Sequence, residues 1–179
     1  MSTPLRAVFL DRDGTLNVER ALVRIPDELE LLPGVGPALH ALREAGYALI
    51  VVTNQSARAR GHITDEELST VHDHLRTLLA PFDAAPDDIL HCPHHPTEGE
   101  PPLRQSCTCR KPEPGLIQQA AARHDLDLSR SWMIGDALPH MEAGRRAGLP
   151  CLSVRTGQGA TAAPPGLAHR SGDRPVGDR

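Results

Sequence analysis

Short apolar runs alternate with amphipathic segments along most of this chain. The apolar runs predict buried strands at 5–10, 47–52, 89–90, 131–134 and 151–154. Between them, apolar residues at helical spacing predict helices at 33–46, 64–79, 113–124 and 138–147. Thr64, with Glu67 three residues later, forms the capping box expected at a helix start. Strands that alternate with helices predict an α/β fold, a Rossmann-like parallel sheet with helices on both faces.

The periodic pattern stops near Gly157. Residues 158–179 are rich in Gly, Pro, Ala, Arg and Asp without any periodicity, so we expect them to form a disordered tail. Residues 1–157 then make a single domain, which is long enough to close one hydrophobic core. In a parallel sheet of this kind, ligands bind beyond the carboxyl ends of the strands.

Composition narrows the possible partners. The net charge is −4 and no run of basic residues occurs, which argues against a nucleic-acid backbone as the partner. The longest apolar stretches are far too short to span a bilayer, and no secretory signal pattern is visible at the N-terminus. We therefore expect a cytoplasmic protein, acting as a monomer on a small molecule, with no membrane or nucleic-acid partner.

Asp11 and Asp13 follow the first strand directly, in the motif Asp-x-Asp-Gly-Thr at 11–15. If the strand continued through them, its alternation would point both carboxylates the same way and turn Arg12 elsewhere. Two carboxylates that close require a cation, and Mg²⁺ is the natural ion for oxygen ligands. One carboxylate could attack phosphorus while the other protonates the leaving oxygen and later activates water. A solvated surface turn is the alternative, which the preceding buried strand disfavours.

A polar segment closes the second strand. It consists of Thr53, Asn54, Gln55 and Ser56. Hydroxyls, amides and backbone N–H groups at a strand end can cradle phosphate oxygens. The alternative is a polar turn that caps the following helix.

Two further charged residues complete the candidate site. Of the 19 basic residues only Lys111 is a lysine, which indicates a position that needs a compact ammonium, although chance survival is the alternative. An ammonium before the helix at 113–124 could neutralise charge on a phosphoryl group. Asp136 follows the strand at 131–134, so it would lie at the same edge of the sheet as Asp11. There it could be a third acidic ligand of the metal.

Taken in order, these motifs resemble those of the haloacid dehalogenase superfamily of phosphotransferases, over residues 5 to about 157. The resemblance implies that Asp11 is the nucleophile and Asp13 the general acid/base. It also implies a Mg²⁺ ion held by Asp11, the backbone carbonyl of Asp13, and Asp136. Thr53 and Lys111 would stabilise the phosphoryl group.

A loop at 92–109 carries a second candidate metal site. Its possible ligands are Cys92, His94, Cys107 and Cys109. Three thiolates and an imidazole suit a closed, structural Zn²⁺ site, and a metal is the expected source of order in a loop with few apolar residues. His95 is a competing ligand, and spacing together with the family pattern favours His94. Cys151 lies in an apolar strand and is expected to be a core thiol.

With this loop, the run at 109–112 resembles a narrower group, the D-glycero-D-manno-heptose 1,7-bisphosphate 7-phosphatases of nucleotide-activated heptose biosynthesis. That resemblance implies a capless enzyme in which Arg110 helps to recognise the substrate. Asn54, Gln55 and Ser56 would contact the sugar phosphate, while Glu19 and Arg20 line the entrance to the site.

The sequence departs from this group at two positions after Asp136. Ala137 and His140 stand where the group usually has Lys and Asp. Arg20, Arg58 or Arg60 could supply the lost positive charge for a second phosphate. Histidinol phosphate is the alternative substrate, and a weakened sugar-phosphate-binding homologue is the alternative to an enzyme.

Overall fold

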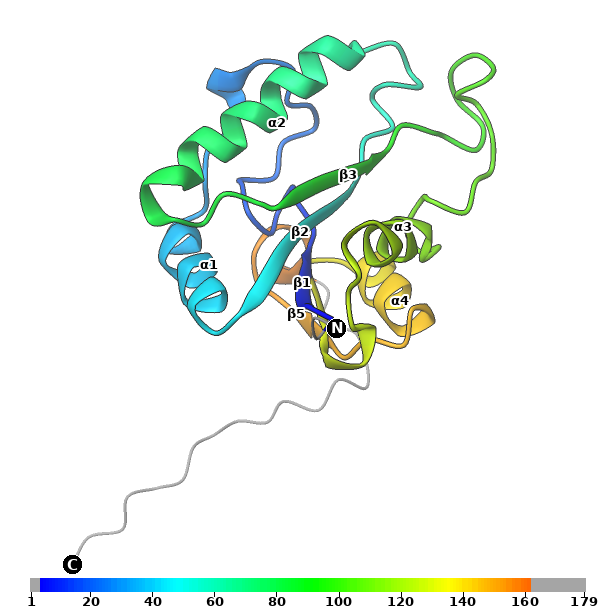
Figure 1. Ribbon diagram of the computed structural model, residues 1–179. Helices are drawn as coiled ribbons and strands as arrows, with labels where there is room; N and C mark the ends of the chain where they lie inside the picture. Colours follow the sequence, from blue (N-terminus) through cyan, green and yellow to red (C-terminus); the bar gives the residue numbers. More distant parts are fainter. Residues whose placement is uncertain (1–3, 162–179) are drawn as a thin grey trace, which may run out of the picture.

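A computed structural model describes residues 4–161. It has one five-stranded, all-parallel sheet in the order β3-β2-β1-β4-β5 (Figure 1). The strands are β1 (Arg6–Leu10), β2 (Tyr47–Asn54), β3 (Asp88–Cys92), β4 (Trp132–Gly135) and β5 (Cys151–Ser153). The helices are α1 (Val35–Glu44), α2 (Asp65–Leu79), α3 (Gly115–His124) and α4 (Leu138–Arg146). The predicted fold class is therefore confirmed, with element ends displaced by a few residues.

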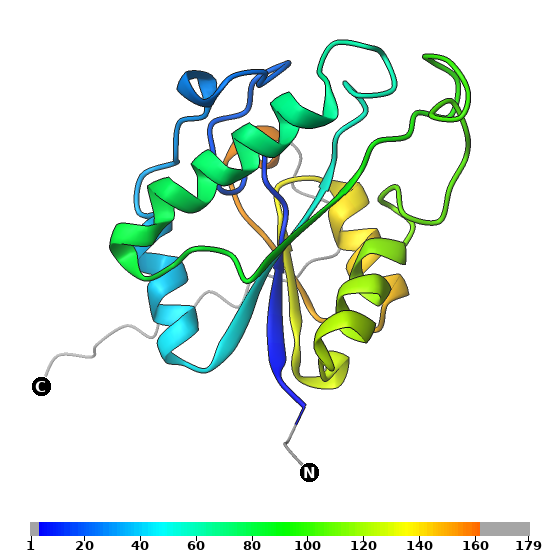
Figure 2. The same ribbon diagram turned by 45° about the horizontal axis from the view of Figure 1, so that its top comes forward.

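The helices cover the two faces of the sheet in pairs. Figure 2, which views the sheet along its edge, shows α1 and α2 on one side and α3 and α4 on the other. The alternation of β1 divides the core accordingly. Phe9 packs in one cluster with α3 and α4, and Val8 and Leu10 pack in the other with α1 and α2. Each fully buried Leu or Ile in these clusters contributes about 2 kcal/mol of transfer free energy.

The N-terminus of α2 is capped as the sequence predicts. Thr64 Oγ1 accepts from the Glu67 N–H at 3.1 Å, and the Thr64 N–H donates to the Glu67 carboxylate at 2.8 Å. This is the predicted capping box. None of the helices in residues 4–161 combines the length and the apolar character that a bilayer crossing would require.

The described chain continues past the domain boundary expected after residue 157. The short 3-10 turn η4 (Gly157–Ala160) packs against the sheet edge, where the Gln158 N–H donates to Asp136 Oδ2 at 2.8 Å. The first residues after this predicted boundary therefore contact the domain. The rest of the predicted tail, 162–179, lies outside the described residues.

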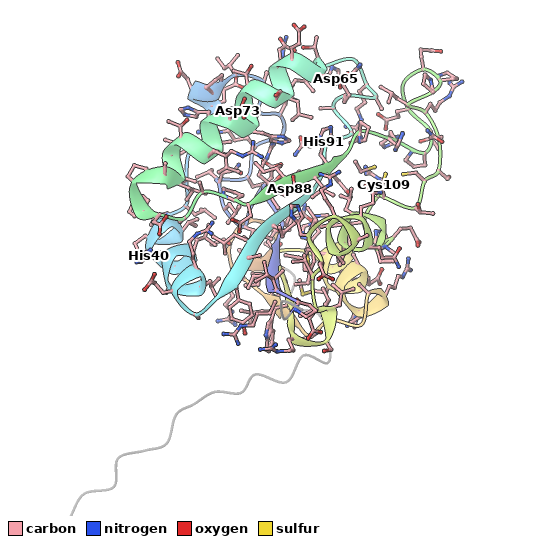
Figure 3. All side chains as sticks on the ribbon, viewed as in Figure 1. His40, Asp65, Asp73, Asp88, His91 and Cys109 are labelled. Atoms are coloured by element: carbon pink, nitrogen blue, oxygen red, sulfur yellow. The ribbon has the colours of Figure 1, made fainter. Side chains whose placement is uncertain are left out.

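A buried histidine lies between α2 and the sheet. His72 is 6% exposed, and the centroid of its ring lies 5.6 Å from that of His91 on β3, which is labelled in Figure 3. His72 Nε2 has no hydrogen-bond partner. Burial first, then the charge of Arg12, lowers the pKa of His72 from 6.5 to about 3.

This burial makes stability depend on pH. The unfolded chain gains a proton on His72 as the pH falls through 6.5, whereas the folded protein does not until about pH 3. Stability is therefore lost on acidification within this window, by about 2 kcal/mol at pH 5. Urea unfolding at pH 7.5 and pH 5 should show a smaller loss for His72→Leu than for the wild type. Equal losses in the two proteins would contradict this assignment.

Candidate active site

The candidate site is a cavity of about 300 Å³ at the carboxyl ends of β1, β2 and β4. This is where ligands are expected on an open parallel sheet. Its lining includes most of the predicted catalytic and substrate-binding residues: Asp11, Asp13, Glu19, Arg20, Thr53, Asn54, Gln55, Ser56 and Asp136. Strands far apart in sequence therefore deliver these side chains to one place.

Asp11 is held at the floor of this cavity. Its N–H donates to the Ile134 carbonyl at 3.0 Å, which extends the pairing of β1 with β4 by one residue. The residue is only 4% exposed. Gly14, with φ +78°, turns the chain just after it, and a Cβ at this position would collide with Asp136 Oδ2. The glycine of the motif thus lets Asp11 and Asp136 approach each other.

The carboxylate of Asp13 is fixed by three neighbouring side chains rather than facing the other carboxylates. Arg12 donates to it at 2.9 and 3.2 Å, Asn17 Nδ2 at 3.0 Å and Gln55 Nε2 at 2.9 Å. The expectation that Arg12 turns elsewhere was wrong. β1 ends at Leu10 and the chain then turns, so strand alternation does not extend to this pair. Arg12 is 1% exposed, and its hydrogen bonds orient the Asp13 carboxylate.

Lys111 is buried against the nucleophile candidate. Its ammonium forms an ion pair with Asp11 Oδ1 and donates to the Val52 carbonyl at 2.7 Å. Asn54 fixes the Lys111 backbone from both sides, since it accepts from the Lys111 N–H at 3.0 Å and donates to the carbonyl at 3.1 Å. Lys111 is 3% exposed, so its charge acts in a weakly screened environment.

The polar residues at the end of β2 contact two different parts of the site. Thr53 is 1% exposed, and its Oγ1 accepts from Gln55 Nε2 at 2.9 Å. Gln55 therefore links Thr53 to Asp13 through hydrogen bonds, whereas Asn54 is hydrogen-bonded to the backbone of Lys111. Ser56 lines the cavity. The interpretation of this segment as only a helix-capping turn does not account for these contacts.

Asp136 supplies the third carboxylate, and a histidine joins it. Asp136 Oδ1 is buried without a hydrogen-bond partner, as is His140 Nδ1, which lies 3.3 Å from it and 3.6 Å from Asp11 Oδ2. Asp11, Asp136 and His140 together could hold a metal ion. An unpartnered buried carboxylate oxygen is costly, so this donor set fits a divalent cation. In the sequence, His140 stood out only as a departure from the family pattern, and its place among the possible metal ligands was not predicted. Its position one helical turn after Asp136 was the available signal.

Glu19 and Arg20 also line the cavity. Burial first, then the nearby carboxylates of Asp13, Asp136 and Asp11, raises the pKa of Glu19 to about 7. Arg20 forms an ion pair with Glu30 at 3.2 Å. Arg110 does not line the cavity. Its guanidinium instead donates to the His94 carbonyl at 3.2 Å, within the loop that carries the second metal site.

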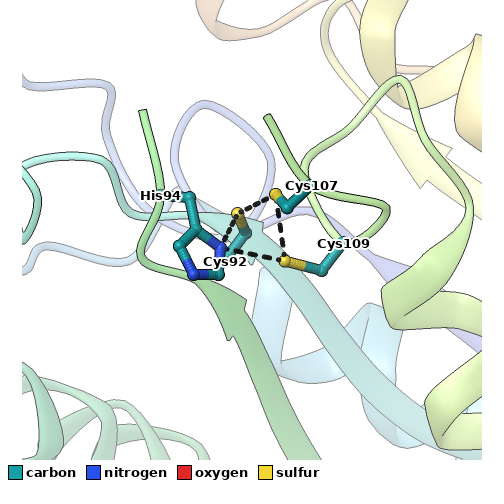
Figure 4. A group of neighbouring side chains, drawn as sticks. All are labelled: Cys92, His94, Cys107 and Cys109. Atoms are coloured by element: carbon teal, nitrogen blue, oxygen red, sulfur yellow. Dashed lines mark hydrogen bonds between the residues drawn. The ribbon is translucent and has the colours of Figure 1, made fainter. Parts of the chain in front are cut away.

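That loop gathers the four predicted zinc ligands (Figure 4). Cys92 Sγ lies 3.6 Å from both His94 Nδ1 and Cys107 Sγ, and Cys109 Sγ lies 3.4 and 3.3 Å from the same two atoms. Tetrahedral Zn²⁺ sets sulfur ligands about 3.8 Å apart and sulfur and nitrogen about 3.5 Å apart. The donor set therefore fits structural zinc.

His94, and not His95, is the histidine of this cluster. His95 Nδ1 accepts from the Glu98 N–H at 2.9 Å and from the Thr97 N–H at 3.3 Å, so its ring is used within the loop. Burial raises the pKa of the Cys92 thiol. A bound cation is the group that would favour its thiolate form.

Removing zinc is expected to weaken both the fold and the active site. The loop leads through Cys109 and Arg110 directly to Lys111, so its collapse should displace the ammonium. A strong chelator, followed by resupply of Mg²⁺, should lower the Tm by about 5–10 °C and reduce turnover. Cys151→Ser, which changes the cysteine outside the cluster, should respond to the chelator as the wild type does. An unchanged Tm and turnover after zinc removal would contradict a structural role.

The fold and this site define a class of protein, a phosphotransferase with an aspartate at the end of its first strand. A family model described as HAD-hydrolase-like matches residues 108–175. Together with the relatives below, this places the chain plainly: it belongs to the haloacid dehalogenase-like hydrolase family. The resemblance drawn from the motifs is confirmed.

The relatives are more specific. A D-glycero-beta-D-manno-heptose-1,7-bisphosphate 7-phosphatase of Salmonella typhi is 42% identical over 163 residues, covering 90% of this chain and 87% of that protein. The protein of the same name from Escherichia coli K12 is 41% identical over 162 residues, covering 90% and 85%. A solved structure of D,D-heptose 1,7-bisphosphate phosphatase from B. bronchiseptica, complexed with magnesium and phosphate, is 37% identical with a TM-score of 0.78. It covers 87% of this chain and 84% of that one.

Proposed function

We propose that this protein is a Mg²⁺-dependent phosphatase that removes the 7-phosphate of D-glycero-β-D-manno-heptose 1,7-bisphosphate through an aspartyl-phosphate on Asp11. The observation that carries this proposal is that three buried residues from distant parts of the chain meet, since Asp11 forms an ion pair with Lys111 and lies beside Asp136. The names and the extent of similarity of the relatives support the substrate and the metal.

In the first step an oxygen of Asp11 attacks the phosphorus of the 7-phosphate. The bond from phosphorus to the sugar oxygen breaks, and the protonated carboxyl of Asp13 gives that oxygen its proton. The Lys111 ammonium offsets negative charge on the transferring group, and Thr53 can donate its hydroxyl to a phosphoryl oxygen. Asp11, the Asp13 carbonyl and Asp136 would hold the divalent ion, which would supply further neutralisation of the negative charge on the transferring group.

In the second step Asp13, now a carboxylate, takes a proton from water, and the hydroxyl oxygen attacks phosphorus. The acyl–phosphate bond breaks, which returns Asp11 and releases phosphate. The hydrogen bonds of Asp13 to Arg12, Asn17 and Gln55 keep its carboxyl group in one orientation through both steps.

The sugar and its second phosphate would extend from this centre towards the cavity mouth. Arg20 and Arg60 line the cavity, each in an ion pair with a partly or fully exposed glutamate, Glu30 or Glu98. Such exposed pairs are weak, so either guanidinium can turn towards a phosphate. Arg58 is held by Asp65 at 2.6 and 2.9 Å and does not line the cavity. Arg20 and Arg60 would thus supply the positive charge that a lysine would provide at position 137.

We further propose that the enzyme works as a monomer in the cytoplasm, without nucleic-acid or membrane partners, in line with its net charge of −4. Residues 1–157, extended by the turn at η4, would be the catalytic domain. Arg110 would act on the substrate only through the position of Lys111, since its own guanidinium is directed into the zinc loop.

Phosphate release from a panel of substrates tests the proposal. The panel contains the β and α anomers of the heptose bisphosphate, histidinol phosphate and simple hexose phosphates, each with Mg²⁺. The β anomer should give the highest kcat/KM. A preference for histidinol phosphate would overturn the substrate assignment. Ligand-induced stabilisation without phosphate release from any of them would identify a binding protein instead.

A further inference from the structure

The group of candidate metal ligands at the active site includes an imidazole nitrogen, that of His140. His140 lies in the first turn of α4, four residues after Asp136, so the two side chains share one side of the helix start. Its Nδ1 lies 3.3 Å from Asp136 Oδ1 and 3.6 Å from Asp11 Oδ2. Neighbouring ligands of an octahedral divalent ion, each about 2.1 Å from the metal, lie about 3.0 Å apart. Both distances from His140 Nδ1 are close to this spacing, and the ligand atoms of the three residues all lie within 4.8 Å of one another.

Hydrogen bonding within the described residues leaves these donors unused. Asp136 Oδ1 and His140 Nδ1 are both buried and neither has a hydrogen-bond partner. The other carboxylate oxygens are engaged, since Asp136 Oδ2 accepts from Gln158 and Asp11 Oδ1 accepts from Lys111. The oxygens and the nitrogen that remain available are the ones that face each other.

Packing holds the imidazole in this orientation. A Cβ at Gly135 would lie 2.6 Å from both Cβ and Nδ1 of His140, so the glycine at the end of β4 makes room for the ring. The His140 side chain is 13% exposed. The ring is thus held against the sheet edge beside the two carboxylates.

We propose that His140 binds the catalytic divalent ion through Nδ1 and shifts the site's preference from Mg²⁺ towards a first-row transition ion such as Mn²⁺ or Co²⁺. This inference rests on the metal-dependent phosphatase proposed above. Mg²⁺ favours a shell of oxygens, whereas imidazole nitrogen adds affinity for transition ions. A site with two carboxylates and one imidazole therefore discriminates between these ions differently from an all-oxygen site.

The alternative is an imidazolium that forms an ion pair with both carboxylates and binds no metal. It would place an N–H on Nδ1, directed at one of the two oxygens. Neither contact has hydrogen-bond geometry, and Asp136 Oδ1 keeps no donor. The arrangement favours a ligand over an ion pair.

Pulsed electron paramagnetic resonance of bound Mn²⁺ tests the proposal directly. The full chain is used with its Cys/His loop filled by Zn²⁺, so that His94 is not available to manganese. The wild type should show the coupling of a directly bound imidazole nitrogen, and His140→Asp, which keeps a donor at this position but replaces nitrogen with oxygen, should lose it. Absence of nitrogen coupling in the wild type would overturn the proposal, whatever the variant does.

Metal affinities give the second readout. Calorimetric titration should show that the ratio of the Mg²⁺ Kd to the Mn²⁺ Kd falls by about tenfold in His140→Asp. His124→Asp, at the opposite edge of the sheet, is the matched control and should keep the wild-type ratio. An unchanged ratio in His140→Asp would overturn the claim on preference. Both readouts are independent of the sugar substrate, so failure to release phosphate from the heptose bisphosphate would count against the proposed function alone.

Discussion

Replacing Asp11 with Asn is expected to lower phosphate release by about 10⁴-fold or more, while the protein stays folded. The amide is nearly isosteric with the carboxylate but cannot act as the nucleophile. It also removes the charge that faces Lys111, so the buried ammonium loses its ion-pair partner. Steady-state kinetics and a thermal melt on the same preparation would measure both effects.

The control for this experiment is Asp27→Asn. Asp27 is an exposed carboxylate in the short turn η1 (Pro26–Glu28), away from the cavity. The same chemical change there should leave turnover at the wild-type level. If Asp11→Asn also released phosphate at near-wild-type rate, the covalent mechanism would be wrong.

The second large effect is expected for Lys111→Arg, which keeps the charge but should still reduce turnover by about 10²-fold or more. The ammonium is enclosed by Asp11 and the Val52 carbonyl, and Asn54 fixes the backbone on both sides. A planar guanidinium is wider than this space and cannot present the same compact charge. Lys111→Met, which removes the charge at similar length, should be at least as damaging.

The exposed Arg130 offers the reverse exchange as a control. Arg130 lies in η3 (Leu128–Arg130), at the opposite end of the sheet from the cavity. Arg130→Lys should therefore keep wild-type kinetics. Near-normal turnover of Lys111→Arg would show that the retention of one lysine among 19 basic residues is an accident of composition.

The sequence predicts the parallel sheet and the meeting of distant residues because these follow from simple rules. Short apolar runs separated by amphipathic segments predict the strands, and the carboxyl ends of parallel strands lie at one edge of the sheet. Asp11, Thr53 and Asp136 each follow a buried strand, so their proximity could be expected. The spacing of the cysteines likewise predicts the zinc cluster.

The failures occur where tertiary packing decides the geometry. Strand alternation misplaced Arg12, since the end of β1 depends on where the backbone turns and not on the local pattern. The hydrogen bond from the Arg110 guanidinium to the His94 carbonyl likewise depends on how the loop folds back, which the sequence pattern does not show. The metal-facing orientation of His140 depends on the space left at Gly135, which no single-sequence pattern reveals.

The proposed roles of Arg20, Arg60 and His140 would let the site tolerate substitution at two family positions. Positive charge near Ala137 can come from Arg20 or Arg60 at the cavity mouth, and a metal donor at 140 can be nitrogen instead of oxygen. The groups that make and break bonds, Asp11 and Asp13, keep their full set of supporting contacts. We therefore expect an active enzyme with altered metal preference rather than an inactive homologue.

In the proposed mechanism the phosphoryl group passes through Asp11. Quenching the enzyme during turnover and reducing it with borohydride converts an aspartyl-phosphate into homoserine, which peptide mass spectrometry locates. We expect homoserine at position 11, formed only in the presence of substrate and absent from Asp11→Asn. Steady phosphate release with homoserine at another aspartate, or at none, would contradict it.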